Sequence, residues 1–138
     1  MSSHIHTIMY ISSGVPDLEE TEIQNILNYA KNNNNLKDIS GFLIFDQGNF
    51  IQLLEGKANL VVDLFDKIQQ DQRHRNIIPV LNQKMDFKGF DFYHSGFKVS
   101  DNSNLLSDLK EYVAILKTVK EPQLKKTINL VDAILEAV

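Results

Sequence analysis

The sequence predicts an α+β sandwich of the ferredoxin-like type, with elements in the order β-α-β-β-α-β-β and two further helices after them. Apolar runs or alternating apolar residues, which are typical of strands, occur in five segments: residues 5–12, 42–45, 50–54, 77–85 and 90–99. Two segments between these strands have apolar residues at helical spacing. We expect residues 1–100 to form the sandwich and residues 101–138 to be a helical extension of the same compact domain.

The second and third strands are predicted to lie at the centre of the sheet. They flank Asp46-Gln47-Gly48, a short loop typical of a hairpin. Both strands are apolar on both faces, so cover is expected above and below. Gln52 breaks the pattern because alternation places it on the same face as Phe50 and Leu54. A buried amide needs partners, so Gln52 bonds either to a backbone group or buried water, or to a bound polar ligand.

Tyr10 lies on the first strand, either as an amphipathic core residue with its hydroxyl at the edge or as part of a site. Asp17 is expected to cap the first helix, with Glu20 three residues later. The buried stripe of that helix comprises Ile23, Ile26, Leu27 and Ala30.

The same helical stripe continues onto Asn33 and Asn34, which lie in a run of four asparagines. We expect Asn32 and Asn35 to form a frayed helix end, because asparagine tolerates the left-handed conformation. Asn33 and Asn34 are instead placed to deliver amides to the sheet face that carries Gln52.

After a turn at residues 55–57, Asn59 is expected to cap the second helix, which ends in the polar run 71–75. That run is either a solvated helix end or a binding site for the phosphate or ribityl tail of a ligand. Pro79 indicates an edge or bulge in the fourth strand. Toward the C-terminus, Pro122 suits the first turn of the last helix. We expect the two C-terminal helices to cover the bare sheet face, with a dimer seam as the second interpretation.

Composition excludes several classes of function. The chain has 138 residues, a net charge of -4 and no cysteine, so it offers neither a basic field for nucleic acid nor a thiol site. The four histidines are not spaced as metal ligands, and we expect no metal. Without a signal-like N-terminus or a long apolar run, a cytoplasmic protein that does not enter the membrane is expected.

The motifs together resemble the BLUF family, which senses blue light with flavin. The resemblance covers about residues 5–99 and rests on motifs that are weak singly: Tyr10-Ile11-Ser12-Ser13, Asn33-Asn34 followed by Ile39-Ser40-Gly41, residues 50–56 (FIQLLEG) and Asp71-Gln72-Arg73-His74. It implies that residues 1–100 bind flavin noncovalently, with FAD expected and FMN or riboflavin as alternatives.

Individual roles follow from the resemblance. Tyr10 is implied to give an electron and a proton to the excited flavin, and the Gln52 amide to rearrange in response. The cofactor-binding residues that it implies, besides these two, are Ile26, Asn33, Asn34, Phe50, Lys67, Ile68, Asp71, Arg73 and His74. Signal output is assigned to Tyr93 and Ser95, which replace the family's usual Trp and Met. Asp38 and Ser40 also replace a usual Gly and Thr.

The resemblance implies a photoreceptor without enzymatic activity that signals to an unknown downstream protein or through its own oligomer, a dimer or larger. Two alternatives remain on the same fold. One is an acylphosphatase-like hydrolase, which needs a phosphate-binding loop with an Arg that residues 12–16 lack. The other is a small-ligand binding module that does not respond to light.

Overall fold

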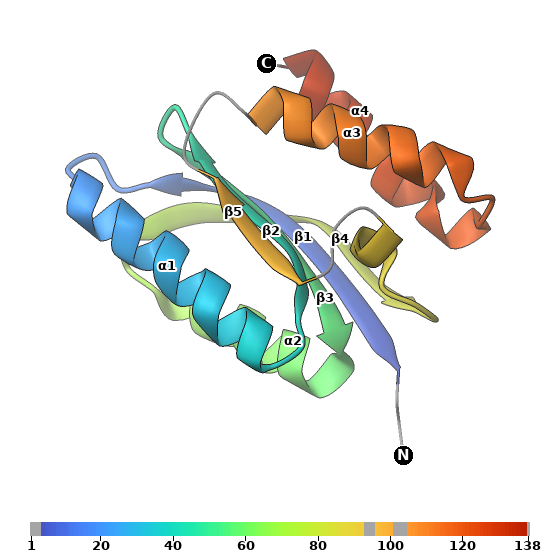
Figure 1. The fold of residues 1–138 in the computed structure, drawn as a ribbon. Coiled ribbons are helices and arrows are strands. Elements are labelled where there is room, and N and C mark those ends of the chain that lie inside the picture. Colours follow the sequence, from blue (N-terminus) through green and yellow to red (C-terminus); the bar gives the residue numbers. More distant parts are fainter. Residues whose placement is uncertain (1–3, 93–95, 101–104, 138) are drawn as a thin grey trace.

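One five-stranded sheet separates two helical layers (Figure 1). The computed structural model describes residues 4–92, 96–100 and 105–137. The elements are β1 (Ile5–Gly14), α1 (Glu20–Leu36), β2 (Ser40–Asp46), β3 (Asn49–Lys57), α2 (Ala58–Gln70), β4 (His74–Met85), the 3₁₀ turn η1 (Gly89–Phe92), β5 (Phe97–Ser100), α3 (Leu105–Thr118), the 3₁₀ turn η2 (Pro122–Leu124) and α4 (Lys125–Ala137).

The strand order is β4-β1-β3-β2-β5, which confirms the ferredoxin-like prediction. β1 pairs antiparallel with β3 and β4, β2 pairs antiparallel with β3, and β5 is added parallel to β2. The β2–β3 hairpin therefore lies inside the sheet, as expected. Its two turn residues, Gln47 and Gly48, have φ of 49° and 83°, the left-handed pair that suits the twist of a two-residue hairpin.

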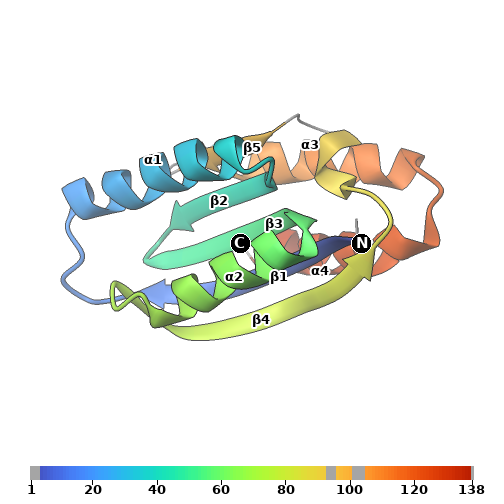
Figure 2. The same ribbon diagram turned by 90° about the horizontal axis from the view of Figure 1, so that it is seen from below.

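Alternation along the strands divides the apolar side chains between two cores. On one face, α1 lies along β2 and β5 while α2 lies along β1 and β3 (Figure 2). This core contains Ile8, Tyr10, Leu43, Phe50 and Leu54 from the sheet. On the other face, Met9, Phe42, Ile44, Ile51 and Leu53 pack against the C-terminal helices. The prediction that these helices cover the second sheet face is confirmed.

Both predicted helix caps are wrong. The first helix starts at Glu20 with Glu19 as its cap, and Glu22 closes a capping box by accepting from the Glu19 amide at 3.4 Å. Asp17 lies in the turn that precedes the helix, in which the Leu18 amide donates to the Val15 carbonyl.

The second helix follows β3 without the predicted turn or an Asn59 cap. Residues 55–57 remain in the strand because they pair with residues 5–7 of β1. α2 begins directly at Ala58, whose amide donates to the His4 carbonyl.

The frayed end predicted for α1 is also wrong. The helix runs through Asn32 and Asn35 to Leu36. Asn35 is held because its Oδ1 accepts the Phe97 amide at 2.9 Å, which ties the last turn of α1 to the start of β5. A long-range partner of this kind is not visible in the local sequence.

The fifth strand is shorter than predicted. Residues 89–92 form η1, and the strand begins only at Phe97. The η1 amides turn toward the Glu55 carboxyl instead of a neighbouring strand. Tyr93 and Ser95 lie outside the described residues. Pro122 begins η2, so α4 starts three residues later than expected. In the described part of the chain, no helix is both long and apolar enough to cross a membrane.

Candidate functional site

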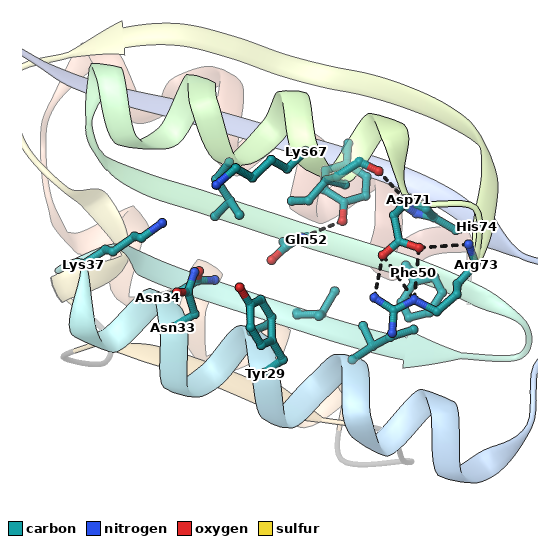
Figure 3. A pocket seen from close by; sticks show the side chains of 16 residues that line it. Tyr29, Asn33, Asn34, Lys37, Phe50, Gln52, Lys67, Asp71, Arg73 and His74 are labelled. Atoms are coloured by element: carbon teal, nitrogen blue, oxygen red, sulfur yellow. Dashed lines mark hydrogen bonds and ion pairs between the residues drawn. The ribbon is translucent and has the colours of Figure 1, made fainter.

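A cavity of about 170 Å³ lies between α1 and α2 above β3 (Figure 3). All eleven residues predicted as cofactor-binding line it: Tyr10, Ile26, Asn33, Asn34, Phe50, Gln52, Lys67, Ile68, Asp71, Arg73 and His74. They come from β1, α1, β3, α2, the connection after α2 and the first residue of β4. The chain therefore brings together side chains that are up to 64 residues apart, from position 10 to position 74.

Tyr10 and Gln52 form the floor of the cavity. They are direct partners in the β1–β3 ladder and are 2% and 3% exposed. Gln52 Nε2 donates to the Tyr10 hydroxyl at 2.5 Å, so the amide has found a side-chain partner rather than a backbone group. Its carbonyl oxygen points away from Tyr10 into the cavity (Figure 3).

The environment keeps the Tyr10 phenol neutral. Burial raises the pKa of Tyr10 far above its ordinary value of 10, because a phenolate would lose its hydration. The hydrogen bond from Gln52 works against this shift and the Asp71 charge adds to it, both to a smaller extent. Tyr10 therefore carries its proton throughout the physiological pH range.

Asn34 supplies an unused acceptor to the cavity. It is 1% exposed, and its Oδ1 has no hydrogen-bond partner within the protein. Leaving such a group unpaired costs roughly 1–3 kcal/mol. Asn33 is half-buried on the same lining. The prediction that the helical stripe delivers both amides to the face of Gln52 is confirmed by this placement.

The charged groups lie away from the floor. The Arg73 guanidinium binds both carboxylate oxygens of Asp71, with Nη2 donating to Oδ2 at 2.6 Å and Nε to Oδ1 at 3.0 Å, and the Arg73 backbone amide also donates to Oδ1 at 2.9 Å. The pKa of Asp71 is lowered chiefly by the guanidinium bonds, which also raise the pKa of Arg73. Lys37 and Lys67 lie toward the opposite end of the cavity (Figure 3). Within the polar run 71–75, Asp71, Arg73 and His74 thus line the cavity, while Gln72 and Arg75 are exposed.

His74 is fixed between two partners. Its Nε2 is 2.7 Å from the Ile68 carbonyl oxygen, and its Nδ1 is 2.8 Å from Ser12 Oγ. A carbonyl only accepts, so Nε2 carries a proton and donates it to Ile68. The ring packs edge-on against Phe50, with the centroids 5.9 Å apart.

Five further residues line the cavity that were not predicted as site residues: Tyr29, Ala30, Lys37, Leu43 and Leu64. Tyr29 follows Ile26 by one helical turn and precedes Asn33 by another, so the α1 stripe contained a signal for it. Lys37 gave no such signal, because its position depends on α1 continuing beyond the asparagine run.

The fold and the cavity together define the class of protein: a ferredoxin-like domain whose cavity has neutral hydrogen-bonding groups on its floor, apolar side chains on its walls and charged groups at its two ends. The chain belongs to the BLUF family, described as sensors of blue light using FAD, whose family model matches residues 5–96.

Two relatives match over little more than half of this chain. It is 34% identical over 80 residues to the photoactivated adenylate cyclase subunit alpha of Euglena gracilis, covering 58% of this chain and 8% of the relative. It is 35% identical over 75 residues to the blue light- and temperature-regulated antirepressor BluF of Escherichia coli, covering 54% of this chain and 19% of the relative. The chain thus spans less than a fifth of each relative.

Two solved structures are similar in fold to this protein over most of its chain. The BLUF domain of BlrP1 superposes with a TM-score of 0.76 at 25% identity, covering 98% of this chain and 92% of that one. The structure of BlsA in its ground state superposes with a TM-score of 0.66 at 26% identity, and the match covers 92% of this chain and 87% of that one. Both similarities extend past residue 96 into the C-terminal helices.

Proposed function

We propose that this chain holds a flavin, FAD in the first instance, in the cavity between α1 and α2 and reports blue light through Tyr10 and Gln52. The observation that carries the proposal is the buried Gln52–Tyr10 hydrogen bond on the cavity floor. It joins an oxidisable phenol to a group that can exchange donor for acceptor.

The lining fits a flavin in chemistry. Asn34 Oδ1, which lacks a partner in the protein, would accept the ring N–H of an isoalloxazine. Ile26 and Ile68 supply apolar walls from the two helices. Asp71, Arg73 and His74 are proposed for the ribityl and phosphate end, where polar and charged groups suit the tail. Lys67 lies toward the opposite end of the cavity (Figure 3), so it is not assigned to the tail.

When bound, a flavin supplies absorption of blue light and an excited state that takes up an electron. Tyr10 is the proposed donor, because it is a neutral phenol with a removable proton. The Gln52 amide donates to Tyr10 through Nε2 in the described state. Turning that amide, or changing its tautomer, would present an acceptor to Tyr10 and a donor to the cavity. No charge needs to be buried, and β3 carries the change.

Flavin uptake and the light response test this proposal. Purified protein supplied with FAD, FMN or riboflavin should become yellow, and blue light should shift its absorbance reversibly to longer wavelength. Comparing the three affinities assigns the flavin. A colourless protein that binds none of them would overturn the proposal and favour the module that does not respond to light.

We infer a sensory rather than an enzymatic role. An acylphosphatase-like hydrolase needs an arginine that is free to bind a phosphate, and Arg73, the arginine on the cavity lining, is paired with Asp71. We further infer that residues 1–100 sense light and that residues 101–138 act as an extension of the same unit, signalling to a partner protein or a second copy of the chain. The packing of Leu109, Tyr112 and Leu116 on the sheet supports one unit.

A further inference from the structure

The two strands that carry Tyr10 and Gln52 carry a second polar pair on the opposite face of the sheet. Thr7 and Glu55 are partners in the β1–β3 ladder, three positions from the first pair. An odd spacing reverses the face of a strand side chain, so the second pair points away from the cavity. Both residues are buried, at 0% and 1% exposure, and Thr7 Oγ1 donates to Glu55 Oε2 at 3.1 Å.

The Glu55 carboxyl also binds the η1 turn. Its Oε1 accepts the Phe90 amide at 2.6 Å, and the Gly89 amide donates to the carboxyl as well. A Cβ at position 89 would lie 2.7 Å from Leu124 Cδ2, so a larger residue than Gly89 would displace the Leu124 side chain. One carboxyl thus joins the central strand to η1, which contacts α3 and β2 (Figure 1).

The groups around Glu55 disfavour its charge. Burial raises the pKa of Glu55 to about 7, against the opposing effect of its bonds to Phe90, Thr7 and Gly89. Of the charged groups on the η1 segment, Asp91 adds repulsion, while Lys88 is engaged by Asp38 at 3.1 Å and by Asp91 at 3.6 Å. Tyr112 on α3 lies close enough to feel the charge of this carboxylate. The pKa of its phenol is raised mainly by burial and, to a smaller extent, by the negative charge of Glu55.

We propose that Glu55 is a positioning residue, a carboxyl latch whose ionisation sets how firmly η1 is held on the β1–β3 pair beneath the cavity. When the carboxyl is ionised, all three donors bind it with charge assistance, which roughly doubles the strength of such bonds. When the carboxyl is protonated, the Thr7 hydroxyl can turn and accept a hydrogen bond from the new carboxyl O–H. The Gly89 and Phe90 amides can only donate, so they lose the charge-assisted part of their bonds.

The latch has a consequence for signalling that rests on the proposed function. A change at Gln52 alters the β1–β3 pairing at Tyr10, three positions from Thr7 and Glu55. The latch carries that change through the sheet to η1 and the α3 contact. Glu55 therefore links the light-sensing face to the face covered by the C-terminal helices.

The test of the latch needs neither flavin nor light. In NMR titrations of the full chain, the Glu55 side-chain carboxyl carbon and the Phe90 amide proton should move together with one midpoint near pH 7. Glu55→Gln should abolish the Phe90 titration. Asp63→Asn, which removes an exposed α2 carboxylate, should leave the titration unchanged. Asp91→Asn keeps the latch and should lower the midpoint, so it tests the idea even if Glu55→Gln misfolds.

The inference is overturned if Glu55 titrates near the ordinary glutamate value of 4.5, or if Phe90 does not follow it. A second experiment records the same NMR spectra of flavin-loaded protein in the dark and under blue light. The Phe90 amide signal should shift with light in wild type and not in Glu55→Gln. If flavin binding or the light response fails while the pH titration remains, the proposed function fails and the latch stands. A normal absorbance shift without movement of Phe90 removes the latch from signalling.

Discussion

Replacing Glu55 by glutamine should change how the stability of the protein depends on pH. The Glu55 pKa is 4.5 in the unfolded chain and about 7 in the fold, so between these values the native state binds more protons than the unfolded state. Stability from this group is therefore fully present below pH 4.5 and is lost as the pH rises through about 7. At about 1.4 kcal/mol per pKa unit, the shift of about 2.5 units corresponds to about 3 kcal/mol.

Urea unfolding of wild type and Glu55→Gln at a series of pH values measures this effect. Taking the difference between the two proteins removes the contribution of groups that both contain, such as Asp71, whose lowered pKa acts with the opposite sign. The unfolding free energy of wild type minus that of the variant should fall by about 3 kcal/mol between about pH 4 and pH 8. A flat difference, or one that rises with pH, would refute a buried carboxyl held near neutrality.

Three other substitutions test the site and the fold. Tyr10→Phe should bind flavin and lose the photocycle in flash spectroscopy; a full response would assign the electron donor to another residue. Asn34→Ala should weaken flavin binding about fivefold, measured by titration, because one hydrogen bond contributes about 1 kcal/mol, and an unchanged affinity would mean that Asn34 Oδ1 does not contact the ligand. Gly41→Ala should unfold the protein in circular dichroism, since φ is +137° and a Cβ would lie 1.9 Å from the Leu53 carbonyl oxygen; a folded variant would show that β2 can move away from β3.

The sequence was most informative where periodicity alone determines placement. Alternation in 50–54 put Gln52 on one face and Leu53 on the other, as found. The helical stripe of α1 likewise placed Asn33 and Asn34 at the cavity. In both cases a side chain's direction depends only on its distance along a regular element, so the local pattern was sufficient.

Features that depend on distant partners were not predictable in this way. Glu55 was assigned to a turn, because no local pattern indicates that a carboxylate will be buried under η1 amides 35 residues away. Asn35 was assigned to a frayed end although its partner is the Phe97 amide on β5. A distant partner also explains why the fifth strand is shorter than predicted, since the Gly89 and Phe90 amides bond to the Glu55 side chain rather than to a neighbouring strand.

The light-minus-dark absorbance spectrum of flavin-loaded Gln52→Ala, recorded beside wild type and the surface control Gln69→Ala, tests most directly whether the Gln52 amide is the switch. Wild type and Gln69→Ala should show the same reversible shift to longer wavelength, while Gln52→Ala should bind flavin and show none. A normal shift in Gln52→Ala would contradict the role given to the Gln52–Tyr10 pair.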